Sequence, residues 1–113
     1  MSQASVSKVL FKKVAFIGLG LIGSSLARVI VAEQLASEIV ASTRSKKTLE
    51  DAKALGLIQH GYANPEEAVQ GADLIVLALP VRATQKVLEQ IKPYLAENVI
   101  ITDVGSTKGN VVD

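Results

Sequence analysis

The spacing of three glycines, Gly18, Gly20 and Gly23, is the strongest chemical signal in the sequence. They follow a short apolar run and precede a segment with helical periodicity, a context typical of a turn that binds a dinucleotide. The first glycine allows a tight bend, the second lets the backbone approach a pyrophosphate, and the third lets the helix pack on the strand. The alternative is a turn that only joins a strand to a helix. On the first interpretation the cofactor-binding residues are Gly18, Leu19, Gly20, Leu21, Ile22 and Gly23.

The segment about twenty residues beyond these glycines bears on the choice between NAD and NADP. In NAD-binding proteins of this kind an Asp or Glu lies there and binds the ribose 2′-hydroxyl. This chain has no acid between Val40 and Thr48. Hydroxyls and a guanidinium there suit a 2′-phosphate, which an Asp would repel. We predict NADP as the preferred cofactor and NAD as the second candidate; a solvated basic helix start is the alternative. The predicted ligands are Ser42, Thr43, Arg44 and Ser45, with Lys46 and Lys47 close by.

Three longer segments resemble those of a known family. They are GLGLIGSSLA at 18–27, GADLIVLALPV at 71–81 and ITDVGSTKG at 101–109. All three are similar to segments of prephenate and arogenate dehydrogenases, also called cyclohexadienyl dehydrogenases, of tyrosine biosynthesis. The third is the most specific, since many related dehydrogenases share the first two. The resemblance covers residues 12–113. It implies oxidative decarboxylation of prephenate to 4-hydroxyphenylpyruvate, or of arogenate to tyrosine, with hydride transfer to NADP or NAD.

The resemblance also assigns roles to individual residues. It implies that Ser106 is catalytic and hydrogen-bonds the reacting hydroxyl; a helix cap is the alternative role for this serine. Asp103 is expected to be a structural or capping acid rather than a general base. The backbone at the end of a central strand should pass close to the adenosine side of the cofactor, and the loop before the serine should line the nicotinamide end. These further cofactor-binding residues are Leu79, Pro80, Val81, Val104 and Gly105.

The catalytic histidine that the family uses as a base lies beyond the last motif, and we find no counterpart in these 113 residues. The only histidine, His60, is expected to be a surface residue. The helical C-terminal domain that forms the homodimer is also expected to be absent, so the chain alone should bind cofactor but turn over poorly. Two other functions remain open: another dehydrogenase on the same scaffold, such as a hydroxy-acid dehydrogenase or imine reductase, or a non-catalytic NADP-binding module.

Composition excludes several other classes of protein. The chain has no cysteine, so disulfides and thiolate metal sites are excluded, and no metal site is expected. A net charge of +1 does not suggest a nucleic-acid partner. No apolar run approaches the ~18 residues of a membrane helix, and the N-terminus does not read as a signal peptide. We therefore expect a cytoplasmic protein whose partner is a small-molecule substrate.

Alternating strand and helix patterns must position these residues. Strands are expected at 13–18, 38–43, 59–63, 73–79 and 98–104, and helices at 21–34, 45–56, 64–71 and 82–92. Such alternation predicts an α/β fold of Rossmann type, a doubly wound parallel sheet of about five strands in three αβα layers. Residues 1–11 are expected to be flexible, and 12–113 to form the dinucleotide-binding domain. Asn64 and Glu67 should form a capping box, and Gly56 should end its helix in a left-handed conformation. The helical residues expected to face the core are Ile22, Leu26, Val29, Ile30, Leu49, Ala52, Leu55, Val87, Leu88, Ile91 and, just beyond, Leu95.

Overall fold

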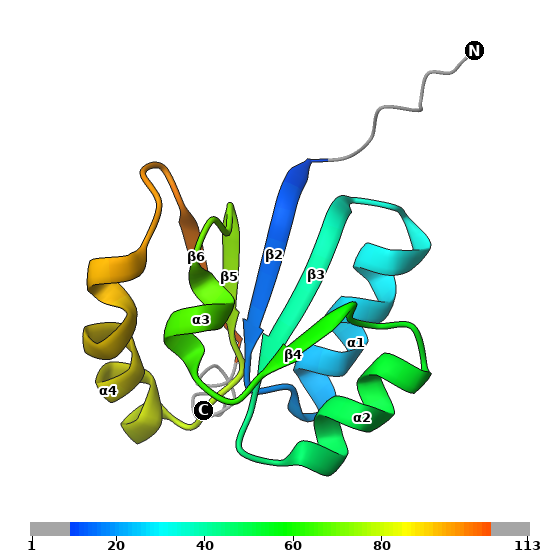
Figure 1. Ribbon diagram of the computed structural model, residues 1–113, viewed down its shortest axis with the longest axis horizontal. Helices are drawn as coiled ribbons and strands as arrows, with labels where there is room; N and C mark the ends of the chain where they lie inside the picture. Colours follow the sequence, from blue (N-terminus) through cyan, green and yellow to red (C-terminus); the bar gives the residue numbers. More distant parts are fainter. Residues whose placement is uncertain (1–9, 105–113) are drawn as a thin grey trace, which may run out of the picture.

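The computed structural model describes residues 10–104, which form a parallel sheet with helices on both faces (Figure 1). The five strands lie in the order β4-β3-β2-β5-β6, and every pairing is parallel. The predicted doubly wound α/β fold is therefore confirmed. In chain order the elements are β2 (Phe11–Ile17), α1 (Gly20–Ala32), β3 (Ala36–Ser42), α2 (Lys46–Ala54), β4 (His60–Tyr62), α3 (Pro65–Val69), β5 (Leu74–Leu77), α4 (Val81–Ile91), the 3-10 turn η1 (Lys92–Tyr94) and β6 (Ile100–Asp103).

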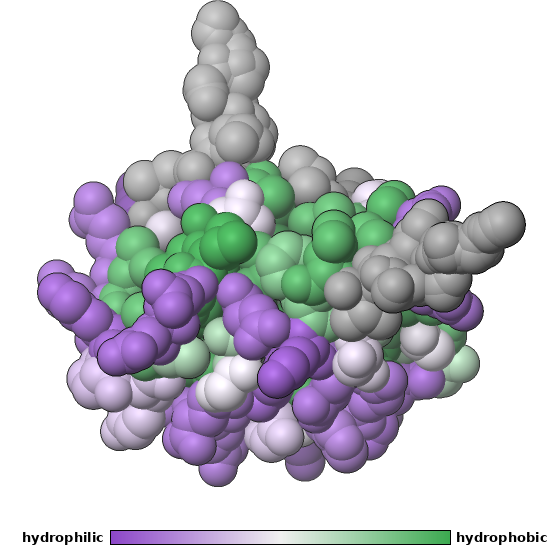
Figure 2. Space-filling model, turned by 90° about the horizontal axis from the view of Figure 1, so that it is seen from above, coloured by the Kyte–Doolittle hydropathy of each residue, from purple (hydrophilic) through white to green (hydrophobic). Residues whose placement is uncertain are grey.

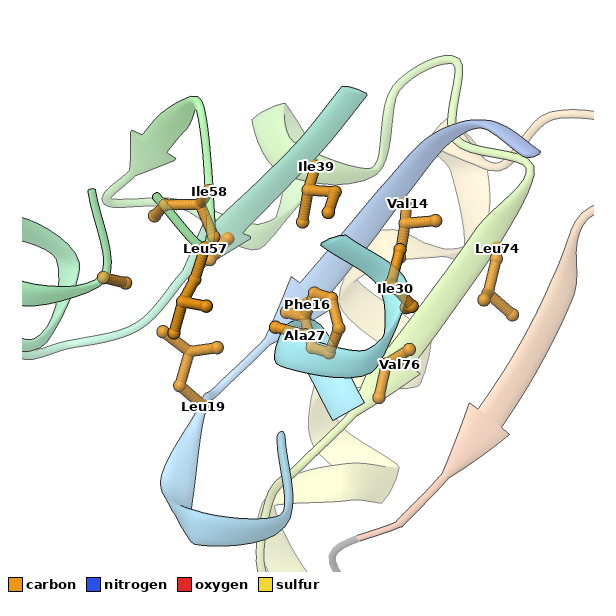
Figure 3. Close-up of a cluster of buried hydrophobic side chains, with 12 residues drawn as sticks. Val14, Phe16, Leu19, Ala27, Ile30, Ile39, Leu57, Ile58, Leu74 and Val76 are labelled. Atoms are coloured by element: carbon orange, nitrogen blue, oxygen red, sulfur yellow. The ribbon is translucent and has the colours of Figure 1, made fainter. Parts of the chain in front are cut away.

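The central strand β2 contributes to two separate hydrophobic clusters, because successive side chains of a strand point to opposite faces of the sheet. Val14 and Phe16 pack with α1 and α2, and Figure 3 shows this cluster around Phe16. Ala15 and Ile17 pack with α3 and α4 on the opposite face. Figure 1 shows the two helix pairs on the two sides of the sheet. Burial on both faces accounts for the high apolar content of the strands.

The ends of α1 and α2 are closed by the same hydrogen-bond pattern. After α2, the N–H of Gly56 donates to Lys53 and that of Leu57 donates to Ala52, at 3.0 and 2.9 Å. Gly56 has a φ of 76°, so its predicted left-handed conformation is confirmed. The equivalent position after α1 is Gln34, with a φ of 54°. A glutamine in this left-handed conformation has a conformational strain that a glycine would not have.

The capping box predicted at the start of α3 is wrong. Asn64 is the N-cap residue, but its side chain makes no capping hydrogen bond. Its carbonyl oxygen instead accepts the N–H groups of Glu67 and Ala68. The carboxylate that finds a partner is that of Glu66, which accepts a hydrogen bond from Gln90 on α4. The amide of Asn64 is therefore not used within the helix start.

Two residues predicted to face the core are exposed instead. Val29 lies one residue before the buried Ile30, which is about 100° around the helix axis, and the small Ala27 takes the inward position. Leu55 follows Leu49 and Ala52 at spacings of three residues, each about 60° short of a full turn. It therefore drifts away from the core, and Leu57 in the following turn is buried.

Most boundaries agree within two residues. The strand β2 begins at Phe11, ahead of the predicted start, and α4 begins at Val81. The strand β5 ends at Leu77, earlier than predicted, because the chain turns away at Ala78 to pass over Gly18. β6 starts only at Ile100, after a turn in which Asn98 has a φ of 63°. Asparagine tolerates this left-handed conformation better than most residues.

The edge strand β6 is only partly covered by the other described residues. Within residues 10–104 it pairs only with β5, and Ile100 and Ile101 are 55% and 37% exposed. Figure 2 looks onto the end of the molecule at which β2 begins, where hydrophobic residues form a band between hydrophilic rims. Leu10, just before β2, is 67% exposed. The carboxyl ends of the strands, where ligands of such sheets gather, lie at the opposite end.

Candidate nucleotide-binding site

A cleft opens at the carboxyl ends of β2, β3 and β5. The chain leaves β2 for β3 on one side and later crosses to β5 on the other, so β2 and β5 flank the point at which the strand order reverses. Ligands of open α/β sheets bind at this point. The cleft has a volume of about 520 Å³. Its lining residues are Ile17, Gly18, Ser42, Thr43, Arg44, Ala63, Asn64, Pro65, Leu79, Pro80, Ala83, Val87 and Gln90.

The first glycine of the motif lines this cleft. Gly18 has a φ of 79°, and its N–H donates to the carbonyl oxygen of Ser42 at 2.7 Å. A Cβ at this position would lie 2.6 Å from the carbonyl oxygen of Ala78 and 2.8 Å from Leu79 Cδ2. Both the backbone conformation and the close approach of the β5 turn therefore require glycine.

The start of α1 leaves backbone donors without a capping side chain. The N-cap residue is Leu19, which has no polar side-chain atom, and the first turn carries no acidic residue. The first helical turn comprises Gly20, Leu21, Ile22 and Gly23. The Leu19 side chain is only 2% exposed and packs in the core, so any contact it makes with a nucleotide is through the backbone. Free N–H groups and the positive end of the helix dipole favour an anion here.

The polar residues after β3 lie on the same cleft, with one exception. Ser42, which is 3% exposed, and Thr43 and Arg44 line it. Arg44 is exposed and makes no ion pair or hydrogen bond with the described residues. Ser45 is not among the lining residues, and its Oγ accepts the N–H of Thr48 at 3.2 Å as the N-cap of α2. Ser45 therefore caps the helix that the sequence predicts at 45–56.

Several residues of the cleft were not found by sequence reasoning. Ala63, Asn64 and Pro65 follow the short strand β4, while Ala83, Val87 and Gln90 come from α4. The carboxyl ends of parallel strands share one edge, so the position after β4 gave a usable signal for the first group. The α4 residues gave none, because helical periodicity indicates the face toward the core and not the rim of a cleft.

The residues assigned to the nicotinamide end lie apart from this cleft or outside the described part of the chain. By contrast, Leu79 and Pro80, which were assigned to the adenosine side, line the cleft, and Val81 is the first residue of α4. Val104 packs against the cluster on the α1 side of the sheet, with its N–H donating to Leu77 at 2.9 Å. Gly105 and Ser106 lie outside residues 10–104. His60 is exposed on β4, as predicted.

The wall of the cleft between α3 and α4 carries one hydrogen bond between side chains. Gln90 Nε2 donates to Glu66 Oε2 at 2.8 Å. This bond, together with the backbone N–H of Glu66 itself, holds the pKa of the Glu66 carboxyl below its usual value of 4.5. Glu66 is therefore ionised at neutral pH, and the contact ties the start of α3 to the last turns of α4.

Residues 10–104 contain neither a membrane-spanning helix nor a metal-binding cluster. No helix in this range is long and apolar enough to cross a membrane. No group of three or more His, Asp or Glu side chains within it could hold a metal ion.

The topology and the position of the cleft define a Rossmann-type α/β domain. Residues 13–105 match the family described as NADP oxidoreductase, coenzyme F420-dependent, and the chain belongs to this family. It is 40% identical to the cyclohexadienyl dehydrogenase of Zymomonas mobilis over 102 residues, 90% of this chain and 35% of the relative. The resemblance to prephenate and arogenate dehydrogenases inferred from the sequence motifs is thus confirmed.

Solved structures agree. The arogenate dehydrogenase of Synechocystis has a TM-score of 0.72 and 30% identity, over 81% of this chain and 32% of that one. The prephenate dehydrogenase of A. aeolicus, in complex with hydroxyphenyl propionate and NAD+, superposes with a TM-score of 0.74 at 23% identity, over 81% of this chain and 32% of that one. The chain therefore spans about a third of the length of the relatives it matches, 35% and 32% in these examples.

Proposed function

We propose that the chain is the nucleotide-binding domain of a prephenate or arogenate dehydrogenase that prefers NADP. The observation that carries the proposal is the placement of Arg44, which has no partner within residues 10–104, on the same cleft as the glycine turn at Gly18. A glycine turn alone would indicate only a dinucleotide. The arginine adds a group that distinguishes between the two nicotinamide cofactors.

The residues present fit such a cofactor. The pyrophosphate would lie at the start of α1, where Gly18 and Gly20 let the backbone approach and the first-turn N–H groups are available. The adenosine end would enter the cleft between Arg44 and the apolar residues of the β5 turn and α4. A volume of about 520 Å³ is within the range of ordinary ligand sites. Those apolar residues are Leu79, Pro80, Ala83 and Val87.

The preference for NADP rests on charge. A hydrogen bond to a charged group contributes about 1.5–3 kcal/mol, equivalent to roughly 10- to 150-fold in affinity. Arg44 supplies a guanidinium that can meet a phosphate with two parallel bonds, and the hydroxyls of Ser42 and Thr43 stand beside it on the cleft. The Ser45 hydroxyl accepts the N–H of Thr48 and lies outside the lining of the cleft, but its O–H would still be free to donate to a phosphate held by Arg44. NAD, lacking the phosphate, would gain none of this.

The reaction proposed for the complete enzyme is the oxidative decarboxylation of a cyclohexadienol. The ring carbinol loses a hydride to the bound nicotinamide and its hydroxyl proton to a base, and loss of carbon dioxide makes the ring aromatic. Ser106 would hold the reacting hydroxyl, with Val104 and Gly105 beside the nicotinamide. The base, the homodimer contacts and the residues that distinguish prephenate from arogenate would belong to the rest of the enzyme, which we place in the cytoplasm.

A titration of the purified chain with NADPH and NADH at one ionic strength tests the cofactor assignment. We expect tighter binding of NADPH, and Arg44→Ala should remove most of the difference. Arg28→Ala, which removes an exposed arginine on α1 away from the cleft, is the matched control and should leave both affinities unchanged. Equal binding of the two cofactors by the unaltered chain would overturn the NADP preference.

A further inference from the structure

Gln90, in the last turn of α4, lines the cleft. Of the three α4 residues that line the cleft, Ala83 and Val87 are apolar and Gln90 is polar. Its Nε2 donates to Glu66 Oε2 at 2.8 Å. This contact links two helices that are far apart in the sequence, so the side chain is held from outside the cleft.

The carboxylate of Glu66 determines which way the amide is oriented. An ionised carboxylate only accepts hydrogen bonds, so the nitrogen of Gln90 and not its oxygen must face it. The hydrogen bond from Gln90 also lowers the pKa of Glu66 below its usual value of 4.5, a value at which the group is already ionised at neutral pH. The other carboxylate oxygen, Oε1, is buried without a hydrogen-bond partner among the described residues. The amide therefore retains its oxygen and one N–H for another partner.

We propose that Gln90 reads the base of the bound nucleotide as adenine, and that Glu66 is the positioning residue that fixes the direction of the amide. A glutamine amide matches the N6 and N7 edge of adenine, with the oxygen accepting from the 6-amino group and the nitrogen donating to N7. This inference rests on the proposed function, because it requires the adenosine end of the cofactor to lie in the cleft.

The pairing predicts discrimination against a base with an oxo group at position 6. Hypoxanthine presents two acceptors, O6 and N7, to which an amide of fixed direction can donate only once. A neutral hydrogen bond contributes about 0.5–1.5 kcal/mol. We therefore expect the unaltered chain to bind NADPH about 3- to 10-fold more tightly than the deaminated cofactor, nicotinamide hypoxanthine dinucleotide phosphate.

The test measures the ratio of the two dissociation constants, NADPH against its hypoxanthine analogue, for the chain and its variants. Gln90→Leu removes the amide and should bring the ratio close to one. Glu66→Gln should lower the ratio, because a glutamine at position 66 can both donate and accept and no longer fixes the direction of the Gln90 amide. Gln90→Arg, which offers only donors, should reverse the preference. Gln85→Leu is the matched control, a glutamine on the same helix that is exposed and does not line the cleft.

The other possible outcomes contradict either the inference alone or the proposed function as well. A ratio near one in the unaltered chain, or a ratio that survives Gln90→Leu, overturns the inference while the cofactor site stands. If Asn64→Ala brings the ratio to one and Gln90→Leu does not, then Asn64 recognises the base, and the inference about Gln90 is also overturned. Binding of neither cofactor would overturn the proposed function together with the inference. The far-ultraviolet circular dichroism of each variant shows whether it is folded.

Discussion

Gly18 donates its N–H to the carbonyl oxygen of Ser42, and this 2.7 Å bond ties the glycine turn to the end of the neighbouring strand. In our proposal the glycine turn binds the pyrophosphate, and the segment after β3 binds the ribose with its 2′-phosphate. The bond fixes the distance between them within the free protein. The site is therefore organised before any nucleotide arrives, and changes at Gly18 should affect both stability and binding.

Replacing Gly18 with alanine should be damaging in two ways. A Cβ would lie 2.6 Å from the carbonyl oxygen of Ala78, and the φ of 79° is strained for any other residue. We expect the free energy of unfolding to fall by about 1–3 kcal/mol, and NADPH binding to be lost. Urea unfolding and a nucleotide titration measure the two effects.

The control for this change is Gly56→Ala. Gly56 has a similar φ of 76°, but nothing lies within 4 Å of an added Cβ. It should lose only the conformational term, about 1 kcal/mol, and should bind NADPH unchanged. Equal losses of stability in Gly18→Ala and Gly56→Ala would show that the close approach of Ala78 is not a constraint.

Gln34→Gly should stabilise the protein. Gln34 has a φ of 54° at the end of α1 and is exposed, so the substitution relieves strain without removing a buried contact. We expect a gain of about 0.5–1 kcal/mol in urea unfolding. Asn98→Gly, at a φ of 63°, is the comparison. Because asparagine tolerates this conformation, its gain should be smaller; a larger gain at Asn98 would contradict the explanation.

The two helix N-caps should respond differently to alanine. Ser45 accepts the N–H of Thr48 at 3.2 Å, so Ser45→Ala should cost about 1 kcal/mol in the nucleotide-free protein. Asn64 makes no capping bond with its side chain, so Asn64→Ala should cost much less. Thermal unfolding of the two variants under the same conditions makes the comparison. A cost for Asn64→Ala equal to that for Ser45→Ala would mean that the amide caps α3 in solution.

Acid should weaken the contact between α3 and α4. The pKa of Glu66 is lower in the folded protein than its usual 4.5, so the carboxylate stabilises the fold above pH 4.5. That contribution is lost as the pH falls through the folded pKa. Glu66→Gln should therefore make the urea midpoint less sensitive to pH below 4.5. Glu67→Gln, at the adjacent exposed residue, is the control. An identical response in both variants would show that the effect of acid does not depend on the hydrogen bond between Glu66 and Gln90.

The parts of the site that depend on local sequence could be predicted, and those that depend on packing between distant elements could not. Gly18 of the glycine turn and Arg44 of the segment after β3 are predicted directly from their spacing, and both line the cleft. Gln90 is 24 positions from Glu66, and nothing in either local sequence indicates that they meet. The same limit applies to Asn64, whose position at a helix start predicts a cap that the structure does not form.

Helical periodicity also predicted the buried residues correctly only where the sheet covers that face of the helix. The α4 residues Val87, Leu88 and Ile91 pack against the sheet as predicted. Val29 and Leu55 fit a helical pattern by count but lie outside the arc that the sheet covers. The width of that arc depends on small residues such as Ala27, which periodicity treats as neutral.

The position of β6 at the edge of the sheet formed by residues 10–104 has a consequence for how this kind of protein can diversify. None of its residues lines the cleft, and its outer edge has no neighbour in the described part of the chain. New polypeptide can therefore be joined at that edge without touching the residues that we assign to the nucleotide. If the proposed function holds, the portion that binds the substrate could be exchanged between related enzymes while the nucleotide cleft stays unchanged.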